Sequence, residues 1–170
     1  AKETRIGVEL SGPDASDITT TGKIEGDFAG GGTPNNSNPR MRLAYLDLNF
    51  GNGFSFRAGQ DWFLFNSILP KTSDGSLLGD AGFIWGRVPQ IRFSYDSEIG
   101  SLKMLSKIAV TRTIGQDLDG GGVDDGTDNG SPSVQANLGF EFPLLTEKAT
   151  KFNIGGHFGT ETVDTVTAAA

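Results

Sequence analysis

The chain has 170 residues, 36% of them hydrophobic, and a mean hydropathy of -0.24, values that fit one folded domain over residues 1–170 and exclude a helical membrane protein. It has no cysteine and one histidine, which excludes disulfides and thiolate metal sites and leaves little material for zinc binding or a histidine-based triad. The net charge of -7 argues against nucleic-acid binding, because neutralising phosphates requires clustered Lys and Arg.

Apolar and polar residues alternate with a period of two along most of the chain, which is the pattern of strands with one apolar face. In the first such segment Ile6, Val8 and Leu10 share one side. The third segment slips out of phase, which predicts a β-bulge near Leu46. The eight expected strands lie near residues 5–11, 23–28, 40–50, 54–65, 85–96, 102–111, 133–142 and 152–158. We therefore expect an all-β fold with antiparallel strands.

The connections between these strands alternate in length. The "GNG" at residues 51–53 predicts a tight hairpin turn with positive φ angles, and "SEIG" at 97–100 predicts a second short turn. Long connections are expected at 30–39, 66–83 and 115–132. Short turns on one rim and long loops on the other are typical of membrane β-barrels.

Two architectures produce this alternation. In a soluble β-sandwich the apolar faces meet each other, whereas in a transmembrane barrel they meet lipid and the polar faces line a lumen. Aromatic residues at strand ends, strands of about ten residues and the alternating loops favour the antiparallel transmembrane barrel. A soluble β-sandwich binding or adhesion domain is the alternative. Under the barrel hypothesis the residues expected to face lipid include Ile108, Val110, Val134, Leu138 and Phe140.

Four stretches, taken in order, resemble a known family: "TTTGKIEGDFAGGG", "PRMRLAYLDL", "RAGQDWFLFNSILP" and "GFIWGRVPQIRFSYD". They resemble the opening strands of Gram-negative outer-membrane porins, closest to the DcaP-like group, over about residues 4–112. The remainder is similar by strand pattern alone. The resemblance implies a 16-stranded, usually trimeric barrel in the bacterial outer membrane. It also implies a long third loop, here Asn66–Phe83, that folds into the lumen as a constriction.

The chain departs from that family at its C-terminus. Eight strands are half of a 16-stranded barrel, and the end "TVTAAA" lacks the terminal aromatic residue of family members. We therefore expect the chain to be incomplete at its C-terminus, as the N-terminal half of such a barrel. A genuine eight-stranded barrel, packed with side chains, is the alternative.

The resemblance carries a channel-lining role to Arg40, Arg42, Arg87 and Arg92, which match places where such porins put arginines. Strand alternation adds further candidates for solute selectivity, namely Arg57, Lys103, Lys107 and Asp61. Together these charges would create a transverse field that acts on small anionic or dipolar solutes. Alternatively, the arginines only satisfy carboxylates on neighbouring strands.

No enzyme motif is found, and no cofactor or metal site is expected. The aspartates of "GQDLDGGGVDDGTDNGSP" could offer oxygen ligands to Ca²⁺, but the loop lacks EF-hand spacing, so we expect a solvated extracellular loop. His157 is interpreted as a residue of the lumen wall, and a barrel-embedded hydrolase would need a base pair that one histidine cannot supply. The sequence thus predicts a homotrimeric outer-membrane porin, a passive diffusion channel for small hydrophilic, anionic solutes.

Overall fold

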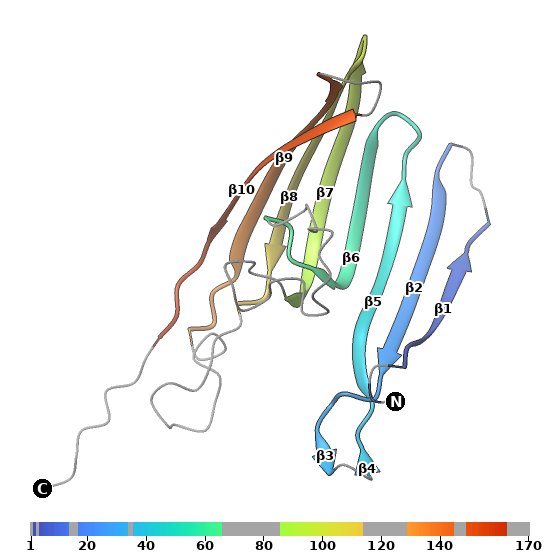
Figure 1. The fold of residues 1–170 in the computed structure, drawn as a ribbon, viewed down its shortest axis with the longest axis vertical. Coiled ribbons are helices and arrows are strands. Elements are labelled where there is room, and N and C mark those ends of the chain that lie inside the picture. Colours follow the sequence, from blue (N-terminus) through green and yellow to red (C-terminus); the bar gives the residue numbers. More distant parts are fainter. Residues whose placement is uncertain are drawn as a thin grey trace, which may run out of the picture.

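The computed structural model describes residues 2, 4–13, 17–33, 36–65, 86–113, 129–144 and 149–162. Within these ranges the chain is all-β and forms an eight-stranded antiparallel sheet, with a small two-stranded sheet beside it (Figure 1). No helix in the described ranges is long and apolar enough to cross a membrane.

The strands of the large sheet pair in chain order, β1-β2-β5-β6-β7-β8-β9-β10. Their bounds are β1 Ile6–Ser11, β2 Thr19–Asp27, β5 Arg40–Asn49, β6 Phe54–Trp62, β7 Arg87–Ile99, β8 Leu102–Thr111, β9 Ser133–Pro143 and β10 Ala149–Phe158. The eight strands expected from the alternation are confirmed. The short hairpin of β3 (Gly32–Thr33) and β4 (Asn36–Ser37) was not expected, because strands of two residues carry no periodic signal.

The prediction of a barrel is confirmed only as far as the sheet. In the described part of the chain β1 pairs with β2 alone and β10 with β9 alone, so the sheet is open and these two strands form its edges. Figure 1 shows β1 and β10 at opposite sides of the sheet. Closing only eight strands requires strong tilt and curl. The curvature of this sheet leaves its edges apart.

The bulge lies at Arg42, not near Leu46 as the sequence predicted. The pairing of β2 with β5 shifts from Glu25–Leu43 to Gly26–Met41, so Arg42 has no partner in the register. Both Arg42 and Leu43 consequently turn toward the side of the sheet that carries Glu25. Leu46 continues the regular alternation opposite Gly22 and Ala58.

The hairpin turn between β5 and β6 forms as the "GNG" motif predicts. Gly51 and Gly53 have φ angles of 74° and 88°, and the Phe50 amide donates to the Phe54 carbonyl at 3.0 Å. The β7–β8 turn at Gly100, with a φ of 62°, lies on the same rim. At the opposite rim β6 ends and β7 begins (Figure 1). The short turns therefore gather on one rim, as expected.

The Gly53→Ala variant is expected to be less stable by about 1–3 kcal/mol, because a Cβ at this left-handed position would collide with the Asp96 carbonyl of the next hairpin. The measurement is the free energy of unfolding from a denaturant titration. Gly156→Ala is the matched control, since a Cβ there meets open space. Equal losses in the two variants would contradict a requirement for glycine at position 53.

Candidate functional site

Burial in this sheet is reversed relative to a soluble protein. Along β9, Ser133, Gln135 and Asn137 are at most 4% exposed, while Val134 between them is 39% exposed. Large hydrophobic side chains are exposed on every long strand of the sheet, for example Ile24, Phe93 and Ile154. Those hydrophobic residues that are buried in the described ranges are Leu43, Leu64, Val88 and Ala109. The candidate site is therefore on the buried, polar side.

The register defines this side, which we call the polar face. Directly paired residues of antiparallel strands point to the same side of a sheet. Arg57 pairs with Arg92, Arg92 with Ala109, and Ala109 with Gln135. Of the residues that the sequence singled out, the following lie on the polar face: Arg40, Arg42, Arg57, Asp61, Arg92, Lys103 and Lys107. His157, which pairs with Gln135, also lies there.

Arg87 differs from the other candidates. It pairs with Trp62 at the end of β6, one position out of phase with Arg92. Its guanidinium carbon lies 5.0 Å from the centre of the Trp62 ring, and that of Arg42 lies 5.7 Å from the same centre. Its Nη1 atom is buried and has no hydrogen-bond partner in the described part of the chain. Arg87 is thus brought to Trp62 rather than into the row of Arg92.

Two of the predicted channel-lining arginines are paired with acids of β2. Asp27, whose side chain is 1% exposed, accepts hydrogen bonds from Arg40 Nη2 at 2.7 Å and Arg42 Nη1 at 2.8 Å. Arg42 Nε also donates to Glu25 at 2.9 Å. Lys23, also on β2, donates to Glu9 of the neighbouring strand β1 at 2.9 Å. The alternative interpretation, that arginines satisfy acids across strands, describes the contacts of Arg40 and Arg42.

A second ion cluster occupies the middle of the sheet. Arg57 donates through Nε to Asp47 at 2.8 Å, makes a second contact with the same carboxylate, and donates through Nη1 to Asp61 at 2.6 Å. Asp61 also lies 3.1 Å from Arg92 Nη1. The Arg57 guanidinium stacks on Tyr45, with 3.8 Å between its central carbon and the ring centre. Arg57 therefore bridges two carboxylates.

Next to this cluster lie four residues that each have a donor group with no acceptor among the described residues, which we call the donor patch: Arg92, Lys107, Gln135 and Asn137. Arg92 Nε, Gln135 Nε2 and Asn137 Nδ2 are buried and make no hydrogen bond with any residue that the structure describes. Lys107 pairs with Asn137 across β8 and β9 and makes no ion pair with any residue that the structure describes. Lys103, whose cross-strand neighbours in the register are Glu98 and Glu141, lies nearer the turn rim.

The chain that leaves β6 crosses above the donor patch. The Leu64 amide donates to Gln135 Oε1 at 2.7 Å, and Leu64 is 2% exposed. The Phe65 ring lies 5.6 Å from the His157 ring. This segment therefore passes β7 and β8 and reaches β9 and β10 (Figure 1). The expected constriction loop, 66–83, lies outside the described residues, but the residues just before it fold across the polar face.

Sequence reasoning did not select the amides of this site. Alternation along residues 133–142 puts Gln135 and Asn137 on the polar side, but it gives no reason to prefer uncharged residues for solute selectivity. Gln90, which donates through Nε2 to the Trp62 carbonyl at 3.0 Å, was missed for the same reason. The available signal was the run of polar residues on one side of β9.

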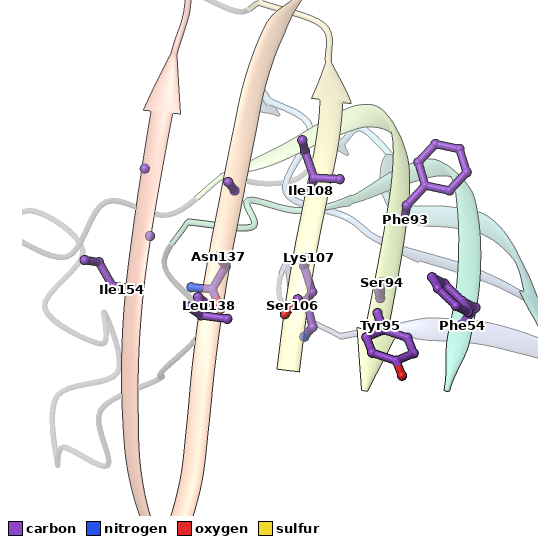
Figure 2. Close-up of a pocket in the computed structure, with 13 residues that line it drawn as sticks. Phe54, Phe93, Ser94, Tyr95, Ser106, Lys107, Ile108, Asn137, Leu138 and Ile154 are labelled. Carbon is purple, nitrogen blue, oxygen red and sulfur yellow. The ribbon is translucent and has the colours of Figure 1, made fainter. Parts of the chain in front are cut away.

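The opposite side, which we call the apolar face, is exposed. Ile108, Val110 and Val134, which the sequence predicts to face lipid, are 51%, 48% and 39% exposed there. Ring pairs lie along this face, with 4.4 Å between the centres of Phe54 and Tyr95. A depression of about 600 Å³ lies on this face between Phe93 and Ile154, whose side chains are drawn in Figure 2.

No metal site is found in the described part of the chain, where no three His, Asp or Glu side chains gather as ligands. Most of the aspartate-rich loop, 115–132, for which the sequence predicts a solvated loop, lies outside the described residues. No protein-family model matches the chain, and no curated protein matches it either.

Proposed function

We propose that the chain forms part of the wall of an outer-membrane β-barrel porin, a passive diffusion channel for small hydrophilic, anionic solutes. The observation that carries the proposal is the reversed burial of the sheet, with polar side chains covered and large apolar side chains exposed on the other face. A membrane β-barrel is stable with such faces, because its apolar side chains meet lipid and its polar side chains point to the interior. The sheet would belong to a larger closed barrel, and the resemblance to porins implies sixteen strands and a trimer.

The soluble β-sandwich explains these features less well. Soluble monomers rarely expose contiguous apolar patches larger than a few hundred Å². Here the exposed residues on β7 and β8 include Ile91, Phe93, Ile108 and Val110, which pair with one another across the two strands. A sandwich would cover this face with a second sheet, and the described residues do not form one.

The preference for anions follows from how the charges of the polar face are paired. Arg40, Arg42 and Arg57 are neutralised by carboxylates, so they contribute little net attraction for a solute. Among the described residues of the polar face, Lys103 and Lys107 form no ion pair, and Arg92 Nε makes no hydrogen bond, so these groups are left for a solute. In a narrow, partly dehydrated pore such donors lower the barrier for an anion more than for a cation.

Reconstituting the purified full-length protein in a planar lipid bilayer tests this function. We expect steady ohmic conductance, and in a potassium chloride gradient a reversal potential of the sign set by chloride. Extraction from cells should require detergent. If the protein is extracted without detergent and produces no conductance, the soluble sandwich is favoured. A reversal potential set by potassium would instead contradict the anionic class of solute.

A further inference from the structure

We propose that Asn52, in the turn between β5 and β6, is a site of spontaneous deamidation to aspartate and isoaspartate, and that the fold protects the second Asn–Gly pair of the chain, at Asn129, from the same reaction. The reacting groups belong to the chain itself, and water is the single co-reactant, so no enzyme is required. The modification adds a negative charge to the turn rim. It does not depend on the proposed function, because neither face of the sheet takes part.

The reaction is a ring closure within the chain. The Gly53 backbone nitrogen attacks Cγ of Asn52, a new C–N bond forms, and the bond from Cγ to Nδ2 breaks. Nδ2 leaves as ammonia with the proton of the Gly53 amide. Water then opens the five-membered succinimide. Cleavage between Cγ and the ring nitrogen gives aspartate, whereas cleavage between the backbone carbonyl carbon and the nitrogen gives isoaspartate, whose main chain is one carbon longer.

The first step of the argument is the conformation of Asn52. Its Oδ1 accepts the Phe54 backbone amide at 3.2 Å, the short-range bond that asparagine makes with the backbone two residues on. The loop of atoms closed by this bond contains all five atoms of the succinimide ring, so the side chain is folded back along the backbone that it must join. The Phe54 donor also points at the oxygen that gains negative charge when Cγ is attacked, and such a donor lowers the barrier.

The second step is the Gly53 nitrogen. It makes no hydrogen bond with any described residue, so its attack does not require a bond of the sheet to break. Asn52 is exposed, which gives water access to the ring. Glycine offers no side chain to hinder the approach, and position 53 requires glycine, because its φ is 88° and a Cβ would collide with the Asp96 carbonyl. The fold therefore keeps the reactive pair at this turn.

The second Asn–Gly pair is held differently. Nδ2 of Asn129 donates to the carbonyl oxygen and to Oγ1 of Thr160, both at 2.8 Å. Its Oδ1 accepts Thr162 Oγ1 at 3.2 Å. Both ends of this amide are thus bound to the segment that follows β10, and these bonds must be released before Cγ can turn toward the Gly130 nitrogen. The two pairs have the same local sequence, so a difference between them comes from the folded structure.

The test measures deamidation of both pairs in the purified full chain, kept folded in detergent micelles in mildly alkaline buffer. Peptide mapping by mass spectrometry at successive times gives the converted fraction of each asparagine, fragmentation distinguishes isoaspartate, and circular dichroism confirms that the sheet persists. Because releasing several hydrogen bonds raises a barrier by enough for a tenfold change in rate, we expect Asn52 to react at least about tenfold faster than Asn129.

Three controls assign this difference to the structure. In the urea-denatured chain the two pairs should react at similar rates. Thr160→Val combined with Thr162→Val removes two exposed hydroxyls that hold Asn129, so it should speed deamidation there several-fold and leave the rate at Asn52 unchanged. Asn52→Gln keeps the amide but would have to form a six-membered ring, and it should stop modification of the turn.

Equal rates at the two pairs in the folded chain would overturn the proposal, as would an Asn52 that stays intact in the folded chain while both pairs react in the denatured one. An unchanged rate at Asn129 in the double threonine variant would overturn its protection by these hydrogen bonds. The measurement involves no conduction, so its result and that of the bilayer experiment stand or fall separately.

Discussion

The Asp61→Ala variant is expected to lose about 3–5 kcal/mol of its free energy of unfolding, as is usual when one partner of a buried ion cluster is removed. Asp61 is 5% exposed and lies between Arg57, at 2.6 Å, and Arg92, at 3.1 Å. The two guanidiniums are cross-strand partners. Without the Asp61 carboxylate they face each other, and Asp47 is the one carboxylate among the described residues that still contacts them. The measurement is a denaturant titration of the protein reconstituted in lipid vesicles.

Glu141→Ala is the matched control for this experiment. Glu141 forms an ion pair with Lys151 on the same face, but the lysine side chain is 58% exposed. Exposed pairs contribute about 0–1 kcal/mol, so this variant should unfold close to the wild type. Similar losses in both variants, or a loss below 1 kcal/mol for Asp61→Ala, would show that the central cluster is well solvated and does not hold the strands together.

The strands could be predicted because their signal is local. Alternation along β8 and β9 alone assigns Lys107 and Asn137 to one side and Ile108 and Leu138 to the other, and the register agrees. The position of the bulge could not be predicted in this way. It depends on the pairing of Arg42 with two acids of β2, and that contact requires the register of another strand.

The candidate site was predictable in its residues and not in its contacts. Strand alternation places Arg57 on the polar face, but it does not state that Asp47 and Asp61 neutralise it. The donor patch depends on a contact between Leu64 and Gln135, which are 71 residues apart in the chain. Such a contact follows from the path of the chain over the sheet, and no local pattern encodes that path.

Closure of the sheet is likewise a global property. The period of two fixes which side of each strand is apolar, whereas curl and shear depend on the number of strands and on the stagger between them. In the described residues β1 and β10 stay at opposite edges. The alternation therefore predicted the faces of the sheet correctly and said nothing about its closure.

On the apolar face, the largest effect of lipid on stability is expected for Ile108→Arg. Ile108 lies within β8 and is 51% exposed on the apolar face. In a bilayer, an arginine at the lipid-facing side near the midplane costs about 2–4 kcal/mol of folding free energy. At an exposed position in water the same substitution changes stability by about 0.5 kcal/mol or less. The measurement is the free energy of unfolding in lipid vesicles.

Ile99→Arg separates the effect of lipid from that of lost apolar contacts. Ile99 belongs to the same face, where it pairs with Leu102, but it ends β7 beside the turn and is 71% exposed. At the membrane interface an arginine costs about 0–1 kcal/mol. The loss of unfolding free energy should therefore be several-fold larger for Ile108→Arg than for Ile99→Arg. Equal, small effects would mean that water covers the apolar face, which no porin wall permits. A large effect at both positions would mean that protein covers it, as in a sandwich. A loss of unfolding free energy that is large for Ile108→Arg and small for Ile99→Arg requires a medium whose polarity changes with depth. A bilayer is such a medium.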